Sequence, residues 1–272
     1  RDRVSMGGAP RSSIMMGKGK KDEAEEIMGN CAMGLLIAGV LLTAFFLIFS
    51  KDLLLLFGAS ENTIAYATAY MQIYAMGTLF VQAALGMNAF ITAQGFATVS
   101  MLSVVIGAVC NIVLDPIFIF GMHMGVRGAA LATIISQGVS AVWVIRFLCG
   151  KKTTLRLKKK YLRISPRVFF PCMALGLSPF IMQSTESILN ICFNSSLLKY
   201  GGDMAVGAMT ILSSVMQFSM LPLQGLTQGS QPIVSYNFGA GNPDRVKRAF
   251  FLLLRSCVCL LYTSDAADEG DS

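Results

Sequence analysis

A long stretch almost without charge is the feature that most constrains how this chain can fold. Between Glu61 and Arg127, Asp115 is the only charged residue in 65 positions. Because a helix needs roughly 20 apolar residues to cross about 30 Å of hydrocarbon, this stretch is long enough for two or more membrane spans. A carboxylate kept inside such a segment needs a proton, a cation or polar partners.

The composition supports a membrane protein. Hydrophobic residues make up 54% of the chain and charged residues 14%, where a soluble domain has about a quarter charged. The net charge of +7 comes from short basic clusters between apolar segments, which argues against a nucleic-acid partner. The seven cysteines lack metal-type spacing and there is one histidine, so we expect packing thiols, no metal centre and no cofactor.

The apolar segments predict an all-α polytopic membrane helix bundle with about six complete spans. The expected spans cover residues 31–50, 65–92, 98–121, 127–148, 168–198 and 204–236, and a seventh begins near residue 247. Residues 51–60 read as a short amphipathic connector at the membrane interface. We expect surrounding lipid and small molecules as the partners of a monomeric protein.

The loop charges predict which side each loop faces. Residues 151–167 contain eight Lys and Arg residues and no acidic residue. Residues 17–26 and 244–248 contain three Lys or Arg residues each, and they fall on the same side when the spans are counted. By the positive-inside rule, these loops are cytoplasmic in a multi-pass protein of the bacterial inner (plasma) membrane.

An internal repeat indicates how the chain is organised. Shifted by 222 residues, segment 7–22 aligns with segment 229–244, and six of 16 positions are identical. Six spans, an even number, lie between the copies, which predicts a parallel duplication about an axis along the membrane normal. We therefore expect a fragment of a parent with two lobes of six helices. Its expected parts are a first lobe at 1–150, which lacks its first helix and part of its second, a basic inter-lobe loop at 151–167, the start of a second lobe at 168–260, and a non-native acidic tail at 261–272.

Three segments resemble the multidrug and toxic compound extrusion (MATE) family. They are residues 111–120, residues 125–137 and residues 228–244, the last of which is similar to the bacterial MepA-like branch. The resemblance implies twelve helices in two lobes. It also implies export of cationic or amphipathic compounds driven by Na⁺ or H⁺.

The first candidate site is a polar cluster around the isolated acid. Asn111 and Asp115 are four residues apart and share one helix face, and Thr133 lies on the following helix. Their oxygens can bind Na⁺, or they can hydrogen-bond a protonated carboxyl group. The alternative is that Asp115 and Pro116 only cap or kink the helix end. The family resemblance implies that these three residues form the cation site of the first lobe.

The second candidate site is a polar stripe in the span at 168–198. Gln183, Glu186, Asn190 and Asn194 recur at helical spacing, so they face either a wet cavity or a neighbouring helix through structural hydrogen bonds. The family resemblance implies a role for Glu186 in cation or substrate coupling. Gln217 and Gln224, near Pro222, are expected to line the substrate cavity.

These observations predict a secondary active antiporter that is not an enzyme. It would export cationic or amphipathic drugs or metabolites in exchange for Na⁺ or H⁺. A lipid-linked oligosaccharide flippase of the same superfold is an alternative, although such flippases usually need a cationic cavity and no intramembrane Lys or Arg is evident. An intramembrane enzyme would need a convergent catalytic centre, which the sequence does not suggest.

Overall fold

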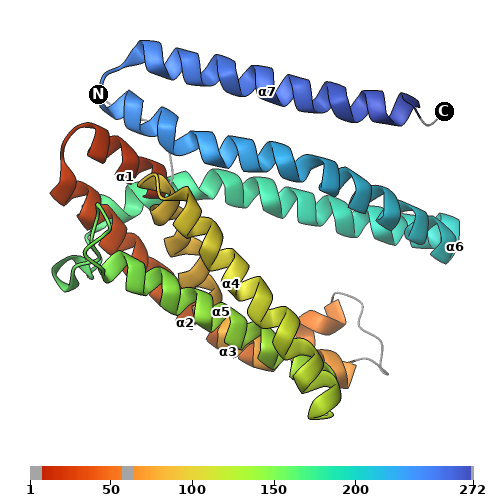
Figure 1. The fold of residues 1–272 in the computed structure, drawn as a ribbon. Helices are drawn as coiled ribbons and strands as arrows, with labels where there is room; N and C mark the ends of the chain where they lie inside the picture. Colours follow the sequence, from red (N-terminus) through yellow and green to blue (C-terminus); the bar gives the residue numbers. More distant parts are fainter. Residues whose placement is uncertain (1–7, 57–63, 271–272) are drawn as a thin grey trace. The chain divides into compact units, whose positions relative to one another are not determined.

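The computed structural model describes residues 8–56 and 64–270, and these residues form helices and no strands. The all-α prediction is therefore confirmed. The elements are α1 (Gly8–Gly17), α2 (Lys21–Leu56), α3 (Ile64–Ala93), α4 (Ala97–Pro116), the π-helical turn η1 (Ile117–Gly121), α5 (Val126–Cys149), the 3₁₀ turn η2 (Lys159–Tyr161), α6 (Pro166–Gly239) and α7 (Pro243–Gly270) (Figure 1).

Four helices in the described residues are long and apolar enough to cross a membrane. They cover Lys21–Leu54, Ala67–Ala93, Ala97–Gly121 and Val126–Cys149, which confirms the helices of the first four expected spans and makes them candidate membrane spans by length and composition. The next two, 168–198 and 204–236, both lie in α6, and the helix breaks between them at Gly202 (φ 64°, ψ −167°). The chain reverses its direction there (Figure 1). Their helical structure is confirmed, and their crossing of a membrane stays a prediction.

Helix α2 is longer than the sequence patterns suggested. It has 36 residues, begins ten residues before the expected span 31–50, and continues to Leu56 through the first part of the expected connector 51–60. The early start is favoured by Asp22 and Glu23 in the first turn, where the helix dipole stabilises negative charge. The leucines after Asp52 are strong helix formers and no glycine or proline interrupts them. The rest of the connector lies outside the described residues.

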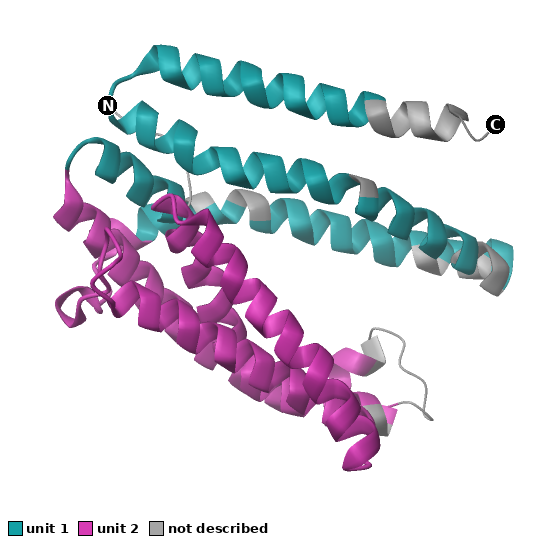
Figure 2. Cartoon of the chain, viewed as in Figure 1, with its two compact units in different colours: residues 1–19, 170–272 teal, residues 20–169 magenta. Residues whose placement is uncertain are grey.

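The chain forms two compact units (Figure 2): unit 1 contains residues 1–19 and 170–272, and unit 2 contains residues 20–169. Within unit 2, α3 packs against both α2 and α5, and α4 packs against α5. Glycines allow these close approaches, since a Cβ atom on Gly77 would collide with Ile134 and one on Gly86 would collide with Leu35. Small residues at helix contacts are typical of membrane bundles.

The internal repeat extends to individual hydrogen bonds. Helix α1 ends at Gly17 and α6 ends 222 residues later at Gly239. In the first copy the Lys18 amide donates to the Ile14 carbonyl at 3.0 Å, and in the second the equivalent bond, from Ala240 to Tyr236, measures 2.9 Å. The following glycines, Gly19 and Gly241, have φ of 75° and 72°, a left-handed conformation that favours glycine. The two copies therefore share one local structure.

The two copies also pack against each other inside unit 1. A Cβ atom on Gly17 would collide with the carbonyl oxygen of Tyr236, and one on Gly239 would collide with the carbonyl oxygen of Ile14. Because Ile14 and Tyr236 are equivalent in the repeat, the contact is reciprocal, as a two-fold relation requires. This packing places residues 1–19 in a unit with residues 170–272, although the sequence assigned them to a first lobe at 1–150. The arrangement of two six-helix lobes stays a prediction, and so does the non-native origin of the tail.

Candidate functional site

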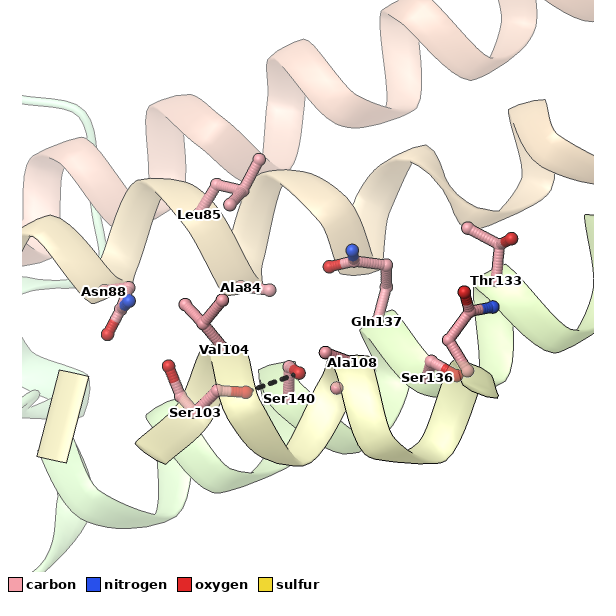
Figure 3. Close-up of a pocket in the computed structure, with 12 residues that line it drawn as sticks. Ala84, Leu85, Asn88, Ser103, Val104, Ala108, Thr133, Ser136, Gln137 and Ser140 are labelled. Atoms are coloured by element: carbon pink, nitrogen blue, oxygen red, sulfur yellow. Dashed lines mark hydrogen bonds between the residues drawn. The ribbon is translucent and has the colours of Figure 1, made fainter. Parts of the chain in front are cut away.

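A pocket of about 200 Å³ whose lining includes seven polar residues lies among the apolar helices α3, α4 and α5, and we call it the α3–α5 pocket (Figure 3). Its polar lining consists of Asn88, Ser103, Asn111, Thr133, Ser136, Gln137 and Ser140. These three helices all belong to unit 2 and contain candidate membrane spans. Polar groups in such spans are costly unless they are satisfied by one another or by a bound species.

The structure brings the predicted residues Asn111 and Thr133 to this pocket. The Asn111 side chain donates a hydrogen bond from Nδ2 to Oδ1 of Asp115 at 3.3 Å, so the expected contact across one helical turn is present. Asp115 is half-buried and lies one turn beyond Asn111, outside the lining of the pocket. The carboxylate is thus linked to the α3–α5 pocket through Asn111.

The backbone changes directly after the acid. Helix α4 continues through Pro116 and widens into the π-helical turn η1. Proline has no N–H group to donate to the preceding turn, and π-helical turns inside α-helices occur frequently at functional sites. The helix therefore does not end at Asp115 and Pro116 but changes to a wider turn, and the role of the carboxylate stays a prediction.

Several pocket residues were missed by the sequence analysis, namely Asn88, Ser103, Ser136, Gln137 and Ser140. A signal was available on α4, where Ser103, Gly107 and Asn111 are four residues apart and therefore share one face. Helix α5 has a similar series in Thr133, Ser136 and Ser140. Small and polar residues repeating at helical spacing in an apolar helix indicate a helix–helix contact. Only the tertiary structure shows that both faces meet at a pocket.

The hydroxyl groups that line the pocket each donate a hydrogen bond to a backbone carbonyl. Ser103 Oγ donates to Ser100 at 2.7 Å, Thr133 Oγ1 to Ala129 at 2.9 Å and Ser136 Oγ to Ala132 at 2.8 Å. Ser140 Oγ donates across the helix contact to the Ser103 carbonyl at 2.9 Å, shown dashed in Figure 3. A hydroxyl that has donated its hydrogen can offer only lone pairs. The α3–α5 pocket is therefore rich in acceptors, which suits a cation or a hydrogen-bond donor.

The second predicted group lies on α6, in unit 1. The side chains of Gln183, Glu186, Asn190, Gln217 and Gln224 are exposed, and the side chain of Asn194 lies outside the described part of the chain. Helix α6 gives the stripe the expected helical spacing. None of these residues lines the α3–α5 pocket, and their roles stay predictions.

Comparison with known proteins gives a consistent result. The MatE family model matches residues 3–117 and 179–262. The multidrug export protein MepA of Staphylococcus haemolyticus is 30% identical over 212 residues, which cover 78% of this chain and 46% of that protein. The chain spans about half the length of the curated relatives it matches.

Solved structures show the same fold. The MATE multidrug transporter DinF-BH matches with a TM-score of 0.83 and 32% identity, and the match covers 95% of this chain and 58% of that one. A MATE crystal structure in the bent conformation matches with a TM-score of 0.88 and 24% identity, covering 95% and 59% of the two chains. The similarity thus extends over nearly all of this chain and over more than half of each solved transporter.

Proposed function

Because this chain belongs to the MatE family, we propose that the protein is a secondary active antiporter that exports cationic or amphipathic compounds in exchange for Na⁺ or H⁺. The relatives that match are named for export and not for catalysis, which supports a transporter over an enzyme. We place it, as a monomer, in the bacterial plasma membrane, since the named relatives are bacterial.

The observation that carries the proposal is the hydrogen-bonded pair of Asn111 and Asp115 beside an acceptor-rich pocket. An ionised carboxylate among apolar helices is unfavourable unless a cation or proton accompanies it. Asn111 donates to this carboxylate, and Asn111 and Thr133 both line the α3–α5 pocket, where their neutral oxygens would bind a Na⁺ ion or accept a hydrogen bond. Entry of the cation on one side of the membrane and its release on the other would couple its gradient to export.

The polar stripe of α6 is proposed as the second part of the mechanism. Glu186 lies between Gln183 and Asn190 on exposed α6, and an acid in a membrane-spanning helix is expected to face other protein or water and not lipid. In the whole protein we place this stripe, with Gln217 and Gln224, on the wall of a substrate cavity. A cationic substrate would then compete with the coupling ion for the carboxylate.

The test replaces Asp115 with Asn in the whole protein and measures export of a cationic dye from proteoliposomes. A Na⁺ gradient and a pH gradient are imposed separately. We expect coupled export to fall by at least about a hundredfold, because the neutral amide cannot exchange a proton or balance a cation. Asp52→Asn is the matched control, since Asp52 is exposed near the end of α2. Export by Asp115→Asn at the rate of the control would overturn the proposal.

A further inference from the structure

The connector between α5 and α6, residues 150–165, is not a free loop. We call it the strap. Within unit 2 it is held by three polar side chains, Glu25 and Asn30 of α2 and Gln94 directly after α3. Each binds a backbone N–H group of the strap, so the three contacts fix its main chain and not only its side chains.

The first anchor is Gln94, at the end of α3. Its Oε1 atom accepts the backbone N–H of Leu155 at 2.8 Å and the hydroxyl of Thr153 at 2.7 Å. Its Nε2 atom donates to the Phe90 carbonyl at 3.1 Å, which orients the amide. Leu155 is fully buried at 0% exposure. Both polar and apolar contacts therefore hold this part of the strap.

The other two anchors, Glu25 and Asn30, lie five residues apart on α2. Glu25, with 1% of its surface exposed, accepts the backbone N–H of Arg156 at 3.1 Å and forms an ion pair with Lys158. Asn30 accepts the backbone N–H of Ser165 at 2.6 Å. Hydrogen bonds to a charged group and to buried partners are the stronger ones, so the strap has a defined conformation.

The outer surface of the strap region is strongly basic. The exposed cations of residues 150–167 other than Lys158 are Lys151, Lys152, Arg156, Lys159, Lys160, Arg163 and Arg167. Residues 150–167 contain no acidic residue. The Lys160 ammonium group lies 5.6 Å from the centre of the Tyr161 ring, and Tyr161 itself packs closely on Gly29. The anchored backbone thus presents a fixed group of positive charges.

An apolar pocket of about 270 Å³ lies beneath the strap, and we call it the strap pocket. The strap contributes Leu157 and Leu162, and the rest of the lining is Ala32, Met33, Leu35, Leu36, Leu79, Ala83, Met87 and Ile145. Leu36 is 50% exposed and Ile145 is 40% exposed. The lining of the pocket is therefore partly accessible on α2 and α5, two helices that contain candidate membrane spans.

We propose that the strap and the strap pocket together bind one anionic phospholipid of the cytoplasmic leaflet. The phosphate would lie on the basic surface of the strap, where the exposed residues Lys160 and Arg163 stand within two positions of the pocket-lining Leu162 in the chain. An acyl chain would enter the strap pocket from the surrounding bilayer. Clusters of Lys and Arg directly next to a membrane span attract anionic headgroups, and a buried chain adds the favourable transfer of its methylene groups. The site is separate from the α3–α5 pocket and does not depend on the exported compound.

Native mass spectrometry of the purified whole protein tests the basic half of the site. The protein in detergent is titrated with phosphatidylglycerol or with phosphatidylcholine, and the bound lipid is counted. Replacing Lys159, Lys160 and Arg163 with Gln is expected to weaken phosphatidylglycerol binding at least about tenfold. The matched control replaces Arg245, Lys247 and Arg248 with Gln, which removes the same charge from the exposed start of α7 and should change binding less than about twofold.

A second variant tests the apolar half. Ala83→Leu fills part of the strap pocket and leaves every charge in place. Phosphatidylglycerol binding should therefore fall as strongly as in the strap variant, the triple replacement of Lys159, Lys160 and Arg163 with Gln. Soluble glycerol phosphate has no acyl chain, so it should not bind detectably to the unchanged protein or to Ala83→Leu. Three results would each overturn the proposal. The unchanged protein could bind phosphatidylglycerol and phosphatidylcholine equally, the strap variant and its control could lose phosphatidylglycerol binding equally, or Ala83→Leu could bind phosphatidylglycerol as the unchanged protein does. Thermal unfolding confirms that each variant is folded.

Discussion

At the scale of single residues, the ion pair of Lys158 and Glu25 joins an exposed ammonium group to a buried carboxylate. The hydrogen bond to Glu25 raises the pKa of Lys158 above its ordinary 10.5, and the negative charges of Glu25 and Asp22 act in the same direction. Since the pKa is raised in the folded protein, the pair contributes its full stabilisation below pH 10.5. That contribution is lost as the pH rises through the higher folded value.

A titration of the lysines tests this pair. Lysines methylated with ¹³C-formaldehyde give resonances that follow the protonation of each amine, and Lys158→Arg identifies the resonance of interest. We expect the titration midpoint of Lys158 to lie above 10.5 and to fall in Glu25→Gln, because the largest cause of the raised pKa is then removed. Glu23→Gln is the matched control, because Glu23 is exposed and pairs with Lys20 at 2.7 Å. A Lys158 midpoint that does not respond to Glu25→Gln would contradict the assignment.

At the scale of elements, the reciprocal contact of α1 with the end of α6 depends on two glycines. A Cβ atom at Gly17 or Gly239 would collide with a backbone carbonyl of the other helix, and backbone atoms cannot rotate away as a side chain can. Forcing extra atoms into a well-packed contact costs about 1–3 kcal/mol. Since the two positions are equivalent in the repeat, their substitutions should have similar effects.

This contact leads to a paired prediction. Gly17→Ala and Gly239→Ala should each lower the free energy of unfolding of the whole protein by about 1–3 kcal/mol, measured by denaturant titration in detergent. Gly225→Ala is the control, because a Cβ atom there meets open space and alanine favours the helix by about 1 kcal/mol. If the control destabilises the protein as much as Gly17→Ala does, the packing of α1 on α6 is not the cause.

At the scale of the whole molecule, the strap joins the four candidate spans of unit 2 to α6. Its many Lys and Arg residues are exposed, and a free loop of this composition would be cut rapidly by trypsin. Because cleavage requires local opening of the chain, the anchored strap should resist it.

Limited proteolysis checks this expectation. Gln94→Ala removes the acceptor for Thr153 and Leu155 and should accelerate tryptic cleavage within residues 150–167 at least about tenfold, since losing a buried hydrogen-bond partner costs about 1–3 kcal/mol. Cleavage after Arg245 to Arg248 in the same sample is the internal control and should keep its rate. Rapid cleavage of the strap in the unchanged protein would show that the anchors do not hold it.

Features that depend on neighbouring residues were predictable from the sequence, and contacts between residues far apart in the chain were not. The contact of Asn111 with Asp115 was predictable because four residues make about one helical turn. The anchors of the strap were not, because Leu155, Arg156 and Ser165 are 61, 131 and 135 residues from the side chains that bind them. The grouping of residues 1–19 with 170–272 depends in the same way on a contact between distant segments.

By itself, the sequence determined the helices, the first four candidate membrane spans, the repeat and the family. These follow from hydropathy and from glycines that end helices, and both act over a few turns of chain. Only the tertiary structure decided which polar helix faces meet at the α3–α5 pocket. It also decided where the basic strap is anchored and that an apolar pocket lies beneath it. These contacts depend on how the helices pack, because a buried donor or acceptor bonds to the group that the folded helices place beside it, however distant that group is in the chain.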